Sequence, residues 1–182
     1  MVFIQLTGLS GAGKSTIAYG VKSLLENNNH RVEVIDADIY RKILCPDLGF
    51  SKEDRKENIR RLGFVANLLA THGVIAILAA INPYEDTRRI LRSYGSHVYT
   101  VWVKCEIQTL ISRDTKDLYK RALLPENHPE KIHNLTGIND PFELPENPDL
   151  ILSTHLESVE KSVEKLFSFI STRIQDKQTS AL

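Results

Sequence analysis

A phosphate-binding loop constrains this chain more than any other feature of its sequence. Residues 8–15 read Gly-Leu-Ser-Gly-Ala-Gly-Lys-Ser and fit the pattern G-x-x-x-x-G-K-[ST]. An apolar run, residues 2–6, precedes the loop, and a helix-forming stretch follows it. In this context the glycines bring backbone N–H groups close to a phosphate chain, and the positive end of the following helix points at the anion. The loop therefore predicts that the chain binds a nucleoside triphosphate.

The residues of the loop have separate expected roles. Lys14 reaches the terminal phosphates, and the Ser15 hydroxyl joins the shell of a Mg²⁺ ion. Arg113, from later in the chain, completes the predicted ATP site. The residues of this predicted site are Gly8, Leu9, Ser10, Gly11, Ala12, Gly13, Lys14, Ser15, Thr16 and Arg113.

Size and composition narrow the class of protein. A chain of 182 residues is long enough for one domain with a proper core. Basic and acidic residues number 23 each, so no net field favours nucleic acid or an anionic membrane. Cys45 and Cys105 lack metal-like spacing and fit a reduced protein better than a disulfide framework. With no leader-like start and no membrane-length apolar run, we expect a cytoplasmic protein without nucleic-acid or membrane partners.

Strand and helix signals alternate along the chain. Strands are predicted over residues 2–7, 31–35, 74–81, 98–103 and 150–153, and helices over 14–28, from 51 onward, from 83 onward and over 156–174. This alternation is typical of a parallel sheet with helices on both faces. The predicted fold class is α/β, a P-loop NTPase-type three-layer α/β/α domain with a mostly parallel five-stranded sheet. We assign residues 1–174 to one P-loop domain and residues 175–182 to a flexible tail.

The long helix after Ser51 begins with a capping pattern, because an acidic residue follows three positions later. Its apolar residues are expected to be buried before Gly73 ends the helix. They are Ile59, Leu62, Phe64, Val65, Leu68 and Leu69.

The stretch from residue 113 to residue 147 breaks the alternation. It is polar, holds several prolines and has no clear strand, so we predict a lid loop, with a solvated linker as the alternative. Arg113, Lys116, Lys120 and Arg121 lie at its start, and as a group they suit closure over a triphosphate.

Two carboxylates, Asp36 and Asp38, follow the second predicted strand. They share an orientation if the chain remains extended. We assign Asp36 to the outer shell of the metal and Asp38 to the acceptor hydroxyl, as orienting group or general base, although these roles could be swapped. A turn stabilised by Asp side chains is the alternative. The predicted catalytic residues are thus Lys14, Asp38 and Asp36, and the predicted metal residues are Ser15 and Asp36.

Arginines beyond the carboxylates predict an anionic acceptor. Arg41 and Arg55 carry the planar fork that binds phosphate or sulfate with two parallel hydrogen bonds. Asn58 shares a helix face with Arg55 at the spacing i, i+3. For Arg60 and Arg61, the helical spacing fits a position on the solvated surface at least as well as a role in ligand binding.

At these residues the chain resembles the adenylylsulfate (APS) kinases, over about residues 3–170. Beside the phosphate loop, the matching motifs are Asp36-Ala37-Asp38 with Arg41, Leu48-Gly49-Phe50-Ser51, Asp54-Arg55-Lys56-Glu57-Asn58-Ile59-Arg60-Arg61, Ile81-Asn82-Pro83-Tyr84, Arg113-Asp114, Leu118-Tyr119-Lys120 and Thr136-Gly137-Ile138-Asn139-Asp140-Pro141-Phe142-Glu143. Apart from the phosphate loop each motif is weak alone, but their order and spacing are highly specific.

The resemblance implies ATP-dependent phosphorylation of the ribose 3′-hydroxyl of adenylylsulfate, with Mg²⁺. It implies that Arg41, Arg55 and Asn58 hold the acceptor, that Phe50 stacks on its base and that the Ile81 backbone lies near its sulfate. Members of the family are commonly dimers. The substrate-binding residues predicted in this way are Asp38, Arg41, Phe50, Arg55, Asn58, Ile81, Lys116 and Leu135.

Three departures from the family pattern affect the acceptor side. Ala37 and Ile39 interrupt the usual Asp-Gly-Asp-Asn-x-Arg, and Asn82 replaces a serine that can be phosphorylated. Leu135 replaces a phenylalanine that sandwiches the adenine, a loss of roughly 1–3 kcal/mol of stacking. Two alternatives follow: a related kinase for another nucleotide-linked acceptor, such as a cytidine compound of cell-surface sugar modification, and a nucleotide-binding switch without turnover. A switch has no reason to assemble the acceptor-side residues.

Overall fold

A computed structural model describes residues 1–179 of the chain, and the side chains of residues 1–176. Within these residues the chain forms one parallel sheet with the strand order β2-β3-β1-β4-β5. The strands are β1 (Phe3–Thr7), β2 (Val32–Asp36), β3 (Ile75–Ala79), β4 (Val98–Lys104) and β5 (Leu150–Ser153). The helices are α1 (Lys14–Asn27), α2 (Ala37–Leu44), α3 (Lys52–Thr71), α4 (Glu85–Arg92), α5 (Ile107–Arg113), α6 (Leu118–Ala122) and α7 (Val159–Thr179).

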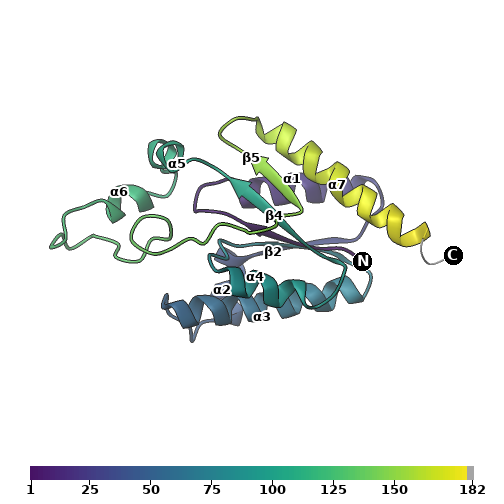
Figure 1. The fold of residues 1–182 in the computed structure, drawn as a ribbon, viewed down its shortest axis with the longest axis horizontal. Coiled ribbons are helices and arrows are strands. Elements are labelled where there is room, and N and C mark those ends of the chain that lie inside the picture. Colours follow the sequence, from purple (N-terminus) through teal and green to yellow (C-terminus); the bar gives the residue numbers. More distant parts are fainter. Residues whose placement is uncertain (180–182) are drawn as a thin grey trace.

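The sheet lies between two layers of helices. In Figure 1, α1 and α7 cover one face, and α2, α3 and α4 cover the other. Successive residues of β1 point to opposite faces, so Ile4 and Leu6 join the core under α1 and α7, whereas Phe3 joins the core under α3. The predicted three-layer α/β/α class is confirmed. Because every strand is parallel, the carboxyl ends of all the strands lie at one edge, where ligands of such sheets bind.

Most predicted elements are confirmed with shifted ends. All five strands form close to their predicted positions, and Ser51 caps α3, its Oγ accepting from the Asp54 N–H at 3.1 Å. The expected burial of Phe64 and Leu68 is wrong, because 58% and 48% of these residues is exposed. Only one stripe of α3 faces the sheet, and it is formed by smaller or better-placed residues such as Leu62 and Ala66.

Three further differences concern helices after β3. The predicted lid region contains a short helix, α6, and α4 begins at Glu85 rather than at Pro83. Helix α7 continues to Thr179, past the predicted helix end at residue 174, and residues 180–182 of the predicted tail lie outside the described residues.

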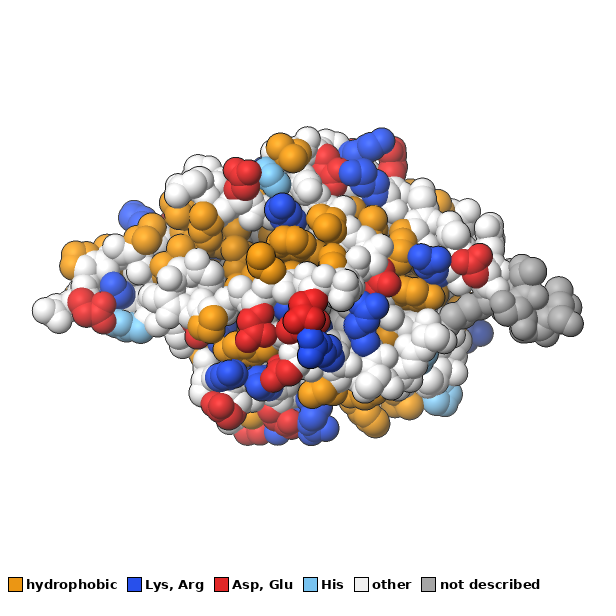
Figure 2. All heavy atoms as spheres, in the orientation of Figure 1, with side chains coloured by type: hydrophobic (Ala, Val, Ile, Leu, Met, Phe, Trp, Pro, Cys, Tyr) orange, Lys and Arg blue, Asp and Glu red, His pale blue; other side chains and the backbone are white. Residues whose placement is uncertain are grey.

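The surface and the helices bear on the expected partners. Figure 2 shows a band of apolar side chains across the middle of one face, with acidic and basic side chains interspersed below it. Neither charge dominates this view, as the balanced composition leads one to expect. None of the helices described combines the length and the apolar character needed to cross a bilayer.

Candidate active site

The phosphate loop connects β1 to α1 at the carboxyl edge of the sheet. Gly8 has a φ of 154°, and a Cβ atom there would lie 2.3 Å from the carbonyl oxygen of Val103, so only glycine fits. Gly13 occupies the N-cap position of α1 with a φ of 96°, and no described side chain caps this end. The N–H groups at the start of α1 therefore remain available to an anion.

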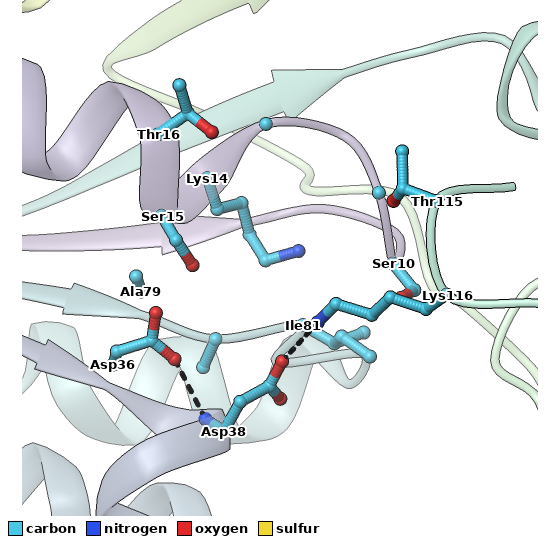
Figure 3. Close-up of a pocket in the computed structure, with 13 residues that line it drawn as sticks. Ser10, Lys14, Ser15, Thr16, Asp36, Asp38, Ala79, Ile81, Thr115 and Lys116 are labelled. Carbon is cyan, nitrogen blue, oxygen red and sulfur yellow. Dashed lines mark hydrogen bonds and ion pairs between the residues drawn. The ribbon is translucent and has the colours of Figure 1, made fainter. Parts of the chain in front are cut away.

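Lys14 extends into the cavity beside this loop (Figure 3). Its ammonium group donates to the carbonyl oxygens of Gly8, at 2.9 Å, and Leu9, at 2.7 Å. Burial lowers the pKa of Lys14 to about 8; the nearby carboxylates of Asp38 and Asp36 oppose this effect, and the charge of Lys116 adds to it. A triphosphate in the cavity would supply the negative charge that favours the ammonium form.

The two carboxylates at the end of β2 and the start of α2 do not share the orientation expected for an extended chain. The backbone turns into α2 directly after Asp36, which becomes the N-cap residue: its Oδ1 accepts from the Asp38 N–H at 2.9 Å. Asp36 is 6% exposed, whereas the Asp38 side chain is 72% exposed. The alternative of an Asp-stabilised turn is thus correct for Asp36, yet both side chains line the cavity that contains Lys14.

Lys116 reaches this cavity from the predicted lid. Its ammonium group lies 2.6 Å from Asp38 Oδ2, a contact drawn in Figure 3. Burial alone would raise the pKa of Asp38, but the hydrogen bond and charge of Lys116, with the charges of Lys14 and Lys42, hold it below its usual value. Asp38 is therefore a carboxylate at neutral pH.

The cavity has a volume of about 220 Å³ and gathers most of the residues predicted for phosphoryl transfer. Its lining includes Ser10, Gly11, Gly13, Lys14, Ser15, Thr16, Asp36, Asp38, Ile81 and Lys116. Thr115 also lines it and was not predicted from the sequence, although it lies between Arg113 and Lys116, which were. Of the other predicted loop residues, Ala12 is buried in the core, and Leu9 points toward Gly137 instead.

Oxygen donors suited to a hard cation meet in this cavity. They are the hydroxyl of Ser15 and the carboxylate of Asp36. Within the described residues no group of three His, Cys, Asp or Glu side chains could hold a metal ion. This donor set fits Mg²⁺, which usually keeps several waters and binds through one or two protein oxygens and the phosphates of its nucleotide.

A second, smaller pocket of about 90 Å³ adjoins the first. It contains the predicted acceptor residues Asp38, Arg41, Phe50, Arg55, Asn58 and Ile81. Asp38 and Ile81 line both pockets and thus form the boundary between them.

The guanidinium groups of the acceptor pocket lie over an aromatic ring. The Cζ atom of Arg41 is 4.2 Å from the centre of the Phe50 ring, and that of Arg55 is 5.5 Å away. Both are anchored to backbone: Arg41 donates to the carbonyl of Leu48 at 2.9 Å, and Arg55 Nε to that of Phe50 at 3.0 Å. The pocket is cationic and has an exposed aromatic surface, which suits an anion that carries a flat ring.

Asn58 adds an unusual group to the same pocket. Its side chain is buried, and its Oδ1 has no hydrogen-bond partner among the described residues. A buried carbonyl without a donor costs free energy of the order of 1–3 kcal/mol. A ligand that offers an N–H or O–H group would relieve this cost.

Beyond the phosphate loop, two predicted residues, Arg113 and Leu135, lie outside both pockets. Leu135 is 6% exposed and packs in the core with residues such as Tyr119, so its side chain does not line the acceptor pocket. Arg113 lies beside Ser10 and Gly11 and donates to the Thr154 carbonyl at 3.2 Å. Arg113, which was predicted to bind ATP, thus lies next to the phosphate loop. Leu135, which was predicted to face the base, lies in the interior.

The chain matches known proteins over most of its length. The sequence profile of the family described as adenylylsulphate kinase matches residues 1–153. An adenylyl-sulfate kinase of Microcystis aeruginosa is 47% identical over 92% of this chain and 90% of that protein. The structure of the Mycobacterium tuberculosis APS kinase CysC in complex with AMPPNP and APS is 35% identical, has a TM-score of 0.85 and covers 93% of this chain and 97% of that one. A hexameric APS kinase from Thiobacillus denitrificans is 28% identical, with a TM-score of 0.67 over 94% of this chain and 29% of that chain.

Proposed function

The chain belongs to the adenylylsulfate kinase family, and we propose that it transfers the terminal phosphoryl group of ATP to the ribose 3′-hydroxyl of adenylylsulfate. The products are ADP and 3′-phosphoadenylylsulfate, the activated form used in sulfate assimilation. One observation supports this most strongly: a phosphate-binding cavity and a cationic acceptor pocket share Asp38 and Ile81 as their boundary. This arrangement holds a donor phosphate and an acceptor hydroxyl next to each other, which is the main requirement of phosphoryl transfer.

On the donor side, the phosphate loop binds the triphosphate. The N–H groups at the start of α1 and the Lys14 ammonium hold the phosphate oxygens, and the ammonium stabilises charge that develops on the transferred group. The Ser15 hydroxyl and the Asp36 carboxylate would hold Mg²⁺. When bound, Mg²⁺ neutralises charge on the phosphates. Residues 113–147 close over ATP, with Arg113 beside the loop and Lys116 at the boundary of the pockets.

On the acceptor side, Arg41 and Arg55 bind the phosphosulfate, Phe50 stacks on the base, and Asn58 accepts a hydrogen bond from the nucleotide. The Asp38 carboxylate orients the 3′-hydroxyl and accepts its proton. The hydroxyl oxygen then forms a bond to the γ-phosphorus as the bond from that phosphorus to ADP breaks. The low pKa of Asp38 keeps it unprotonated and thus able to accept a hydrogen bond from the hydroxyl.

The setting of the enzyme is part of the proposal. We infer a homodimer, by resemblance to the family, and a cytoplasmic location, which is supported by two free cysteines, Cys45 and Cys105.

Measuring ATP consumption against a panel of acceptors tests the proposed function. We expect turnover with adenylylsulfate and release of one ADP for each 3′-phosphoadenylylsulfate. Inactivity with adenylylsulfate, together with clear turnover of a cytidine nucleotide, would show that the donor side is correct and the acceptor is not. Nucleotide binding without turnover of any acceptor would indicate a switch.

A further inference from the structure

A buried arginine, Arg88, lies outside the residues that contact substrates in this proposal. It is 1% exposed and belongs to α4. Its guanidinium group donates three hydrogen bonds of 2.7 Å, from Nε to Glu85 Oε2, from Nη1 to the Asn82 carbonyl and from Nη2 to the Glu143 carbonyl. A buried charge whose three nitrogens each donate a hydrogen bond fixes the groups around it, because removing a partner leaves an uncompensated polar atom. Arg88 therefore fixes two backbone segments far apart in the sequence.

Glu143 makes two more contacts with the same region. Its N–H donates to the Pro83 carbonyl at 2.8 Å, and its carboxylate accepts from the Glu85 N–H at 2.6 Å. Glu85 is the first residue of α4, and the N-cap residue Tyr84 makes no side-chain cap. The carboxylate of Glu143 thus caps this helix from 58 residues away, where its charge also meets the positive end of the helix.

The contacts of Arg88 and Glu143, here called the 88–143 clasp, join two parts of the acceptor pocket. Asn82 and Pro83 are in the wall of that pocket. The segment that ends at Glu143 also contacts Arg55: Arg55 Nη2 donates to the Asn134 carbonyl at 2.6 Å, and Arg55 Nε lies 3.2 Å from Asp140 Oδ2. Residues 134–143 are therefore fixed at one end to an acceptor arginine and at the other to the pocket wall.

The wall itself depends on the same contacts. Asn82 has a φ of 42°, and its buried amide donates to Gln5 Oε1 at 3.1 Å and accepts from Thr87 Oγ1 at 2.6 Å. A residue other than glycine in this left-handed conformation needs surrounding contacts that hold it there. Arg88 supplies one of them at the Asn82 carbonyl.

We propose that Arg88 and Glu143 are positioning residues for the acceptor: they hold residues 134–143 against the wall of the acceptor pocket and so keep Arg55 in its binding position. This inference rests on the proposed function. Within the described part of the chain, Arg88 and Glu143 form no hydrogen bond or ion pair with Lys14 or with the other cavity-lining residues of the phosphate loop. Loss of the clasp should therefore weaken acceptor binding and leave ATP binding unchanged.

Glu143→Ala tests the clasp, because it removes the carboxylate cap and leaves the buried Arg88 and its backbone partners in place. Loss of a helix cap predicts a rise of about fivefold in the KM for adenylylsulfate. The KM for ATP and kcat should stay within about twofold of the unchanged chain. Glu143→Gln keeps an oxygen for the Glu85 N–H and should restore most of the acceptor affinity. Glu146→Ala is the matched control, since Glu146 lies three residues after Glu143 and pairs with the exposed Arg89 of α4.

Hydrogen exchange makes the test independent of the acceptor. In Glu143→Ala without ligand, the amides of Glu85 and residues 134–143 should exchange faster than in the unchanged chain and in Glu146→Ala. Unchanged exchange and unchanged KM would overturn the proposal, as would the same rise in KM for Glu146→Ala. If the unchanged chain fails to turn over adenylylsulfate, the proposed function fails, and the exchange comparison decides on the clasp by itself.

Discussion

The donor cavity and the acceptor pocket adjoin each other but are built in different ways. The donor cavity takes six of its thirteen lining residues from the phosphate loop and the start of α1, residues 10–16, whose conformations depend on local glycines. Its other lining residues lie at or just after the ends of β2 and β3 and at positions 115 and 116. The acceptor pocket takes its walls from α2, from the start of α3 and from residues 80–83, which meet only when the sheet has formed. A local motif supplies the phosphate-loop side of the proposed donor cavity, whereas tertiary packing forms the whole of the proposed acceptor pocket.

This contrast predicts two kinds of mutational effect. Changes in the donor cavity alter groups that touch the transferred phosphoryl, so they should lower kcat. Changes in the acceptor pocket remove binding that is present before reaction, so they should raise the KM of the acceptor. A donor-cavity substitution that raises only the KM of the acceptor, or an acceptor-pocket substitution that lowers only kcat, would contradict this distinction.

Lys14→Ala should have the largest effect. It removes the ammonium group that faces the transferred phosphoryl, and loss of one such donor lowers kcat by roughly 10²–10³-fold. Turnover is measured by ADP release, and an unchanged melting temperature would show that the fold is intact. Lys22→Ala is the control, since Lys22 pairs with Glu26 and Glu33 at the surface of α1. Retained activity in Lys14→Ala would contradict the proposed mechanism.

Asp38→Asn should follow, with a loss in kcat of about 10²-fold, because the amide cannot accept the hydroxyl proton. Asp36→Asn preserves the cap of α2, since asparagine is also a good N-cap residue. It should mainly raise the Mg²⁺ concentration needed for half-maximal rate. If Asp36→Asn abolishes turnover at saturating Mg²⁺ and Asp38→Asn changes the Mg²⁺ requirement, the two roles are swapped.

Arg55→Ala should act on the acceptor alone. Truncation of a buried, charge-assisted contact suggests a rise in the KM for adenylylsulfate of roughly 30-fold, with the KM for ATP unchanged. Steady-state kinetics with each substrate varied in turn would measure both values. Arg60→Ala is a matched control on the same helix, because Arg60 pairs with Glu57 and its side chain is 58% exposed. An effect of Arg55→Ala confined to ATP would show that the acceptor pocket is wrongly assigned.

The sequence predicted the donor cavity better than its surroundings. The phosphate loop, the strand before it and the helix after it depend on near neighbours, and glycine at positions 8 and 13 is required by the backbone itself. The relation of Asp36 to Asp38 was missed because α2 begins immediately, and the cap of Asp36 takes the place of an extended strand.

Errors on the acceptor side have a different cause. Leu135 matches a base-facing position by sequence, but the fold places its side chain in the core. The contacts of Arg88 with Glu143 span 55 residues and have no sequence signal, because neither helical nor strand periodicity connects positions so far apart.

The exposure of Phe64 on α3 was also not predictable from the pattern. The apolar stripe of this helix is wider than the surface that faces the sheet, so some of its residues remain in water.

The smallest expected effect is the pH dependence of ATP binding. Lys14 has a pKa of about 8 in the folded protein, so it loses its proton over a pH range in which an unfolded lysine remains charged. Between about pH 8 and pH 10.5, the unfolded chain binds more protons at this group than the folded chain. The free energy of unfolding therefore rises with pH in this range, because the cost of burying the charged ammonium is lost. Bound triphosphate favours the ammonium form and should raise the pKa of Lys14 again.

ATP binding at pH 8 should therefore take up roughly half a proton, and above this pH its affinity should fall by less than about tenfold per pH unit. Calorimetry in buffers of different ionisation enthalpy measures the uptake. Lys14→Arg keeps the charge but does not titrate in this range, so its ATP binding should show no such uptake. The same uptake in Lys14→Arg would assign the proton to another group, whereas its loss would place the titration at Lys14 in the donor cavity.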